Sequence, residues 1–134
     1  MNELTTGTAH QFLKRFQLRG ARLRRFRVRN APKDATAEVR LTVRDNDKPV
    51  RLRLVFDGVE EFRFQRRPGP GLIRLKCVQV GFFGALTYVN FDPFADDGPP
   101  KVMDFRASDC FVAARSVRWE VVEKASGASG ANPS

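Results

Sequence analysis

The sequence contains a single histidine, His10, and only two cysteines, Cys77 and Cys110, among its 134 residues. A hydrolase or transferase needs an activated nucleophile and a positioned base, and a Ser–His or Cys–His pair in this chain would have to use His10. Nothing around Cys77, Cys110 or Ser108 resembles the sharp turn that presents a nucleophile. The sequence therefore predicts a protein that is not an enzyme.

The two cysteines are 33 positions apart, each lies in an apolar segment, and they form no CxxC pair. This placement is typical of small core residues rather than of a redox or zinc-binding pair. A buried disulfide would require the two strands to be neighbours, and a reducing compartment opposes one. We therefore expect both thiols to be free.

Long hydrophobic runs are also lacking. No segment approaches the ~18 apolar residues that a membrane-spanning helix needs. Residues Met1–Gln11 do not combine a basic start with an apolar stretch, as export signals do. We expect a cytoplasmic protein with no membrane partner.

Neither a metal site nor a phosphate-binding loop is indicated. The segment Asp96-Asp97-Gly98 superficially resembles a calcium loop, but an EF-hand has a Glu six residues after its glycine, and this chain has Asp104 beyond two prolines. The segment Pro68-Gly69-Pro70-Gly71 lacks the Lys-Ser/Thr ending of a P-loop, and no helix follows it. We predict no metal and no cofactor.

The excess of positive over negative charge lies in the first half of the chain. The whole sequence has 24 Lys and Arg against 15 Asp and Glu, a net charge of +9. Residues 1–67 hold 17 of the basic residues and 8 of the acidic ones, whereas residues 68–134 hold 7 of each. Arg accounts for 18 of the basic residues, and its planar guanidinium group suits carboxylate and phosphate. The first half is therefore where a binding surface is expected.

Alternating apolar residues indicate strands in this first half. Apolar side chains occupy every second position from Ala37 to Val43 and from Val50 to Phe56, and Asp45–Pro49 supplies a turn between them. The predicted core positions are Val39, Leu41, Leu52, Leu54 and Phe56, and the predicted exposed positions are Arg40, Arg51 and Arg53. This pattern is a strong signal for a β-hairpin.

A short helix is predicted before these strands. A threonine of the segment Thr6-Gly7-Thr8 can cap a helix over Ala9–Gln17, and Gly20 favours its end. The apolar residues of its buried face are Phe12, Leu13 and Phe16. A strand follows, in which Phe26 and Val28 alternate with arginines.

The second half is richer in apolar residues. The predicted strands are Leu72–Phe83, Ala85–Phe91, Val102–Ala107 and Phe111–Val122. Trp119, the only tryptophan, is expected to pack against the core. We predict a single mainly β domain over residues 1–124, which is a sandwich, roll or curled antiparallel sheet of about seven or eight strands with one short N-terminal helix. Residues 125–134 are small and polar and are expected to form a disordered tail.

The strongest candidate for a binding site is a set of arginines at the polar positions of the predicted strands. These residues are Arg25, Arg27, Arg29, Arg40, Arg44, Arg51, Arg53 and Arg63. If the strands are neighbours, the arginines form one basic patch, which attracts an acidic protein or a nucleic-acid backbone. Alternating arginines also commonly do no more than solvate the outer side of a sheet, so three interpretations stay open at this point.

Two segments resemble a known family. Val50–Val59, followed by the strand that contains Phe64, and then Phe105–Val117 are similar in spacing to the small β-rich immunity proteins of bacterial polymorphic toxin systems. The resemblance covers about half of the chain and brings no catalytic residue with it. It implies a non-enzymatic protein-interaction domain that inhibits a toxin by binding it. The alternative is a nucleic-acid-binding module that uses the arginines.

Overall fold

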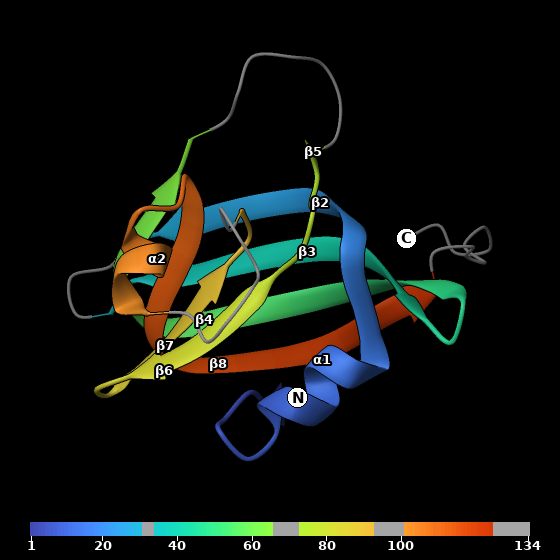
Figure 1. Ribbon diagram of the computed structural model, residues 1–134, viewed down its shortest axis with the longest axis horizontal. Helices are drawn as coiled ribbons and strands as arrows, with labels where there is room; N and C mark the ends of the chain where they lie inside the picture. Colours follow the sequence, from blue (N-terminus) through green and yellow to red (C-terminus); the bar gives the residue numbers. More distant parts are fainter. Residues whose placement is uncertain (31–33, 66–72, 93–100, 125–134) are drawn as a thin grey trace.

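The computed structural model of the protein describes residues 1–30, 34–65, 73–92 and 101–124. Within these residues, eight strands form one curled antiparallel sheet with the shape of a half-barrel (Figure 1), so the predicted mainly β class is confirmed. The strands pair in the order β5-β2-β3-β4-β8-β7-β6, and β1 pairs with β8. The elements are β1 (Asn2–Glu3), α1 (Ala9–Arg15), β2 (Phe16–Arg29), β3 (Thr36–Asp45), β4 (Lys48–Phe64), β5 (Ile73–Arg74), β6 (Gln79–Phe83), β7 (Leu86–Asn90), α2 (Val102–Arg106) and β8 (Cys110–Lys124).

The hairpin of β3 and β4 has the predicted register. Val39 pairs with Leu54 and Leu41 with Leu52, and all four side chains are buried. The turn is tight because Asn46 and Asp47 adopt positive φ angles of 54° and 66°, which Asn and Asp tolerate better than most residues. The inner side of the hairpin therefore supplies the centre of the core. The outward residues Arg40, Arg51 and Arg53 are half-buried rather than exposed, because they pack side by side across adjacent strands.

Helix α1 is shorter than predicted and ends at Arg15 instead of Gln17. Phe16 already belongs to β2, where it pairs with Asp45. Gly20 lies at a bend inside that strand and does not end the helix. Thr8 precedes the helix as predicted, but its hydroxyl donates to the carbonyl oxygen of Glu3 instead of capping a helical N–H.

The apolar side of α1 closes one end of the core. Phe12 and Phe16 are buried, but Leu13, predicted on the same side, is 38% exposed. The rings of Phe12 and Phe16 lie 5.4 and 5.2 Å from that of Trp119, centroid to centroid. The prediction that Trp119 packs against the core is therefore confirmed.

The segment Val102–Ala107, predicted as a strand, contains helix α2 instead. Its apolar residues Val102 and Phe105 are three positions apart, which is a helical spacing. Phe105 is fully buried on the outer side of the sheet, in a second, smaller core with Tyr88, Phe111 and Ala113. Gly81 permits this packing, since a Cβ atom there would lie 2.8 Å from the ring of Phe105.

The described part of the chain contains no helix that is both long and apolar enough to cross a membrane. The predicted disordered tail, residues 125–134, lies outside the described residues. Cys77 and Cys110 form no disulfide, as predicted: Cys110 is buried, and Cys77 is half-buried.

Candidate arginine-lined binding surface

Seven of the eight predicted arginines lie on the outer side of β2, β3 and the part of β4 before Gly58. In the register of these strands, Arg25 lies opposite Arg40, which in turn lies opposite Arg53. Together with Arg22, which has the same orientation, they form what we call the arginine surface. Its members are Arg22, Arg25, Arg27, Arg29, Arg40, Arg44, Arg51 and Arg53. The core residues point to the opposite, inner side of the sheet.

Three members of the arginine surface converge on one carboxylate, Glu38. Arg40 Nη2 lies 3.3 Å and Arg25 Nη1 3.8 Å from the Glu38 carboxylate, and Arg53 Nε donates to Glu38 Oε2. Arg53 also donates through Nη1 to Glu120 Oε2 at 3.0 Å. We call these five residues the Glu38 cluster. Within it, much of the arginine charge is already neutralised.

The electrostatics of Glu38 reflect these contacts. Burial alone would raise the pKa of Glu38, because it disfavours the charged carboxylate. The hydrogen bond from Arg53 and the charge of Arg40 outweigh burial, and the pKa lies below its usual value. Glu38 is therefore a carboxylate held ionised by its neighbours.

Arg63 does not join the arginine surface. It lies farther along β4, beyond Gly58, and its Nη1 donates to the carbonyl oxygens of Arg106 and Ser108 at 2.7 and 3.0 Å. Its guanidinium carbon lies 5.8 Å from the centre of the Phe111 ring. These contacts assign Arg63 to the packing of α2, where Arg106 also binds Glu61.

The remaining predicted arginines differ in their surroundings. Arg27 and Arg29 are exposed and line a hollow of about 320 Å³ that also contains Glu38 and Asp57. Arg44 is exposed and its Nη1 contacts the carbonyl oxygen of Asp47 at 3.4 Å. Arg51 is half-buried.

A second arginine site, which was not predicted, lies where β2 separates from β3. Gln17 pairs with Arg44 and Arg22 with Thr42, so four residues of β2 between these pairs face only Val43 of β3. Gly20, with φ at 81°, allows the bend, which would strain any residue that carries a Cβ atom.

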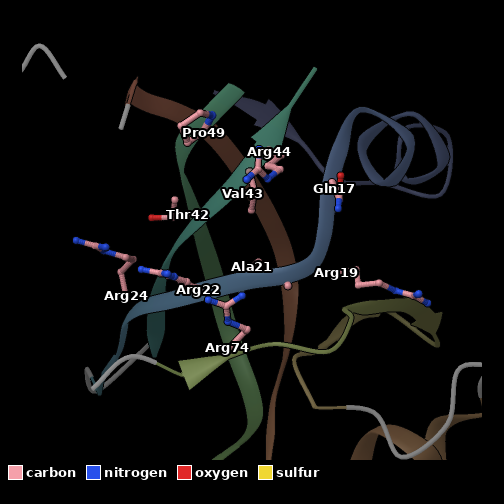
Figure 2. Close-up of a pocket in the computed structure, with 11 residues that line it drawn as sticks. Gln17, Arg19, Ala21, Arg22, Arg24, Thr42, Val43, Arg44, Pro49 and Arg74 are labelled. Atoms are coloured by element: carbon pink, nitrogen blue, oxygen red, sulfur yellow. The ribbon is translucent and has the colours of Figure 1, made fainter. Parts of the chain in front are cut away.

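The bent backbone of β2 bonds to the segment after β5 instead of to β3. Gly20 N donates to Leu75 O, and Leu75 N donates to Ala21 O, both at 2.8 Å. The separation leaves a groove of about 360 Å³, shown in Figure 2 and called the arginine groove below. It is lined by Gln17, Arg19, Gly20, Ala21, Arg22, Arg24, Thr42, Val43, Arg44, Pro49 and Arg74.

Among the residues that the structure describes, the lining of the arginine groove has five arginines and no acidic residue. Arg22 of β2 lies directly opposite Arg74 of β5, and Arg24 is on the same side of the bend (Figure 2). Among the described residues, no carboxylate oxygen comes within 4.0 Å of the guanidinium nitrogens of these three arginines. Like charges directly opposite each other on paired strands are unfavourable. Arg22, Arg24 and Arg74 therefore form a cationic cluster without an anion from the described part of the chain.

Of the lining arginines, only Arg44 belongs to the predicted set. The sequence contained one signal for the groove. The adjacent residues Arg24 and Arg25 interrupt the alternation of polar and apolar residues, and β2 shifts its register against β3 at this point. Arg74 carried no such signal, since it reaches the groove only through the pairing of β5 with β2.

The residues considered for catalysis are differently placed. His10 is exposed on α1. Burial raises the pKa of the Cys110 thiol to about 12, and the buried Ser108 hydroxyl accepts a hydrogen bond from Cys110 N at 3.0 Å. Within the described ranges, no three His, Cys, Asp or Glu residues come together in a way that could hold a metal ion.

No protein-family model, curated protein or solved structure matches this chain. The function is therefore inferred from the geometry and charge of the arginine surface and the arginine groove.

Proposed function

We propose that the protein is a non-enzymatic interaction domain that binds an acidic protein partner through the arginine surface and the adjoining arginine groove. The observation that carries this proposal is the cluster formed by Arg22, Arg24 and Arg74, whose charge no described carboxylate neutralises. Guanidinium groups bind carboxylates through two parallel hydrogen bonds, and Arg is enriched at the energetic centres of protein interfaces.

The shape of the surface favours a protein over a nucleic acid. The arginines lie on the outer, convex side of a curled sheet, and a duplex is itself convex, so the two would touch only along a narrow strip. Proteins that bind single strands stack bases on exposed aromatic rings. From Phe16 to Phe56, the aromatic residues of β2, β3 and β4 are Phe16, Phe26 and Phe56, and all three face the core.

The sharper form of the proposal is that the protein inhibits a toxin, as its resemblance to small β-rich immunity proteins implies. In this form, the partner is an acidic surface on the toxin, and inhibition follows from covering that surface. The packing of Cys110 and Ser108 in the core supports a binding role rather than a catalytic one.

The test compares three labelled probes on the purified protein at increasing salt: a peptide with six consecutive glutamates, a twelve-nucleotide oligo-dT and a twelve-base-pair duplex. We expect the peptide to bind, and both nucleic acids to be released near physiological salt. Phosphate contacts make log affinity fall with log salt by about 0.9 for each contact on a duplex. A nucleic acid that stays bound at physiological salt, with a steep slope and higher affinity than the peptide, would instead identify a nucleic-acid-binding module.

The toxin proposal has its own test. The protein encoded next to this gene is produced and its toxicity is measured with and without the present protein. We expect an acidic toxin that is inactivated at equimolar ratio. A neighbour that is harmless, or a toxin that is unaffected, would contradict this sharper form.

A further inference from the structure

At the arginine groove, β2 and β3 do not pair with each other, whereas they do pair along the adjoining arginine surface. Between Gln17 and Arg22, the backbone of β2 bonds to Leu75 rather than to β3. The resulting groove of about 360 Å³ is near the lower end of the usual size of ligand pockets. Its size suits a few side chains of a partner rather than an extended interface.

The charge of the groove specifies what those side chains are. Arg22, Arg24 and Arg74 lie together on one side of the bend and Arg44 lies across from them (Figure 2), and no described acidic residue lines the groove. Arg22 and Arg74 are directly opposite on paired strands. Such an arrangement becomes favourable when an anion bridges the two guanidinium groups, because each can then form a bidentate pair.

A neutral polar atom in the lining points to the same conclusion. Thr42 Oγ1 is buried and has no hydrogen-bond partner among the described residues. Thr42 pairs with Arg22 across β2 and β3, and its side chain lines the groove. A hydroxyl donates well to a carboxylate oxygen, so an anion that reaches Oγ1 would satisfy this group.

We propose that the arginine groove binds adjacent carboxylates on an acidic segment of the protein partner. This inference rests on the proposed function and deepens it, because it assigns the contact to one place and to one chemical group. The rest of the arginine surface then contributes long-range attraction, which is weakened in the Glu38 cluster by Glu38 and Glu120.

The experiment uses the labelled six-glutamate peptide and two double variants that each remove two positive charges. The groove variant is Arg22→Gln with Arg74→Gln. The control variant is Arg27→Gln with Arg29→Gln, whose exposed side chains lie on β2 outside the groove. Circular dichroism and urea unfolding verify that both variants remain folded.

We expect the groove variant to lower the affinity for the peptide about tenfold or more, and the control variant to lower it less than about threefold. The variant with Arg22→Lys and Arg74→Lys keeps both charges but loses the planar fork, and we expect an intermediate loss. The variant Thr42→Val should lower affinity as well, while the net charge stays the same.

Three outcomes would overturn the inference. If the groove and control variants weaken peptide binding equally, net charge alone attracts the partner, and the proposed function survives without the groove. If the groove variant weakens binding of inorganic phosphate or oligo-dT but not of the peptide, the groove is a phosphate site. If the parent protein does not bind the peptide at low salt, the proposed function fails together with the inference.

Discussion

The Glu38 cluster and the arginine groove place arginines on neighbouring strands in similar ways but balance their charges differently. In the cluster, Arg25, Arg40 and Arg53 stand opposite one another across β2, β3 and β4, and Glu38 lies among them with its pKa lowered. In the groove, Arg22 and Arg74 stand opposite each other with no carboxylate in the lining.

This difference separates arginines that stabilise the fold from arginines that are available to a partner. Ion pairs within the Glu38 cluster are partly shielded from water, since the Glu38 side chain is only 16% exposed. Arg22 and Arg74, directly opposite each other on paired strands, contribute repulsion to the folded state instead of attraction. A row of arginines read from the sequence alone does not distinguish the two roles.

The largest expected effect on stability comes from removing the negative charge of Glu38. The variant Glu38→Gln leaves Arg25, Arg40 and Arg53 facing one another without compensation. Because hydrogen bonds to charged groups contribute ~1.5–3 kcal/mol, we expect the free energy of unfolding to fall by about 2–3 kcal/mol at neutral pH. Urea unfolding at low salt measures this change.

The matched control for this variant is Glu60→Gln. The Glu60 side chain is 53% exposed and its Oε2 lies 3.7 Å from Arg115 Nε, a loose surface pair. We expect a change of less than about 0.5 kcal/mol. Equal effects of the two substitutions would show that Glu38 does not organise the cluster.

Acid should reproduce part of the loss at Glu38. A carboxyl group whose pKa is lower in the folded state stabilises the fold above its unfolded pKa, and this contribution is lost as pH falls through the folded value. The pKa values of both Glu38 and Glu61 are lowered from 4.5, so the free energy of unfolding should decrease below about pH 4.5.

The Glu38→Gln variant and the groove variant test whether this pH dependence comes from the Glu38 cluster or from the arginine groove. In Glu38→Gln, the free energy of unfolding measured with urea should fall less steeply in acid than in the parent protein. The fall that remains should include the contribution of Glu61, which Arg106 and Tyr88 hold ionised. The groove variant with Arg22→Gln and Arg74→Gln should leave the loss of stability in acid unchanged, because no carboxylate of the described residues lines the groove. If the stability of Glu38→Gln falls in acid as steeply as that of the parent protein, Glu38 does not cause this pH dependence.

The sequence predicted the parts of the structure that depend on local alternation. The β3–β4 hairpin follows from apolar residues at every second position, since a shift by one residue would turn Leu52 and Leu54 to solvent. The position of Trp119 against Phe12 and Phe16 followed from its phase in the last strand. The short helix α2 was missed because Val102 and Phe105 are too few to distinguish a helical spacing from a strand.

The candidate site was only partly predictable, because it depends on contacts between distant segments. Alternation placed Arg25, Arg40 and Arg53 on one side of the sheet but did not show that Glu38 lies among them. The groove requires the bend at Gly20 and the pairing of Arg22 with Arg74, which is 52 positions away in the sequence. No local pattern encodes a pairing over such a separation.

The smallest expected effect is a gain in stability, and it is the sharpest test of the difference between the arginine groove and the Glu38 cluster. Replacing Arg22 or Arg74 by Gln removes a repulsion between directly opposed charges, so the free energy of unfolding should rise by about 0.2–1 kcal/mol at low salt. The gain should disappear at 1 M salt, where the Debye length is only about 3 Å. Arg53→Gln, in the Glu38 cluster, should lower stability instead, because it breaks contacts with Glu38 and Glu120. If Arg22→Gln or Arg74→Gln destabilises the protein as Arg53→Gln does, the groove arginines hold β5 against β2, and their unbalanced charge is a feature of the fold rather than a site kept open for a partner.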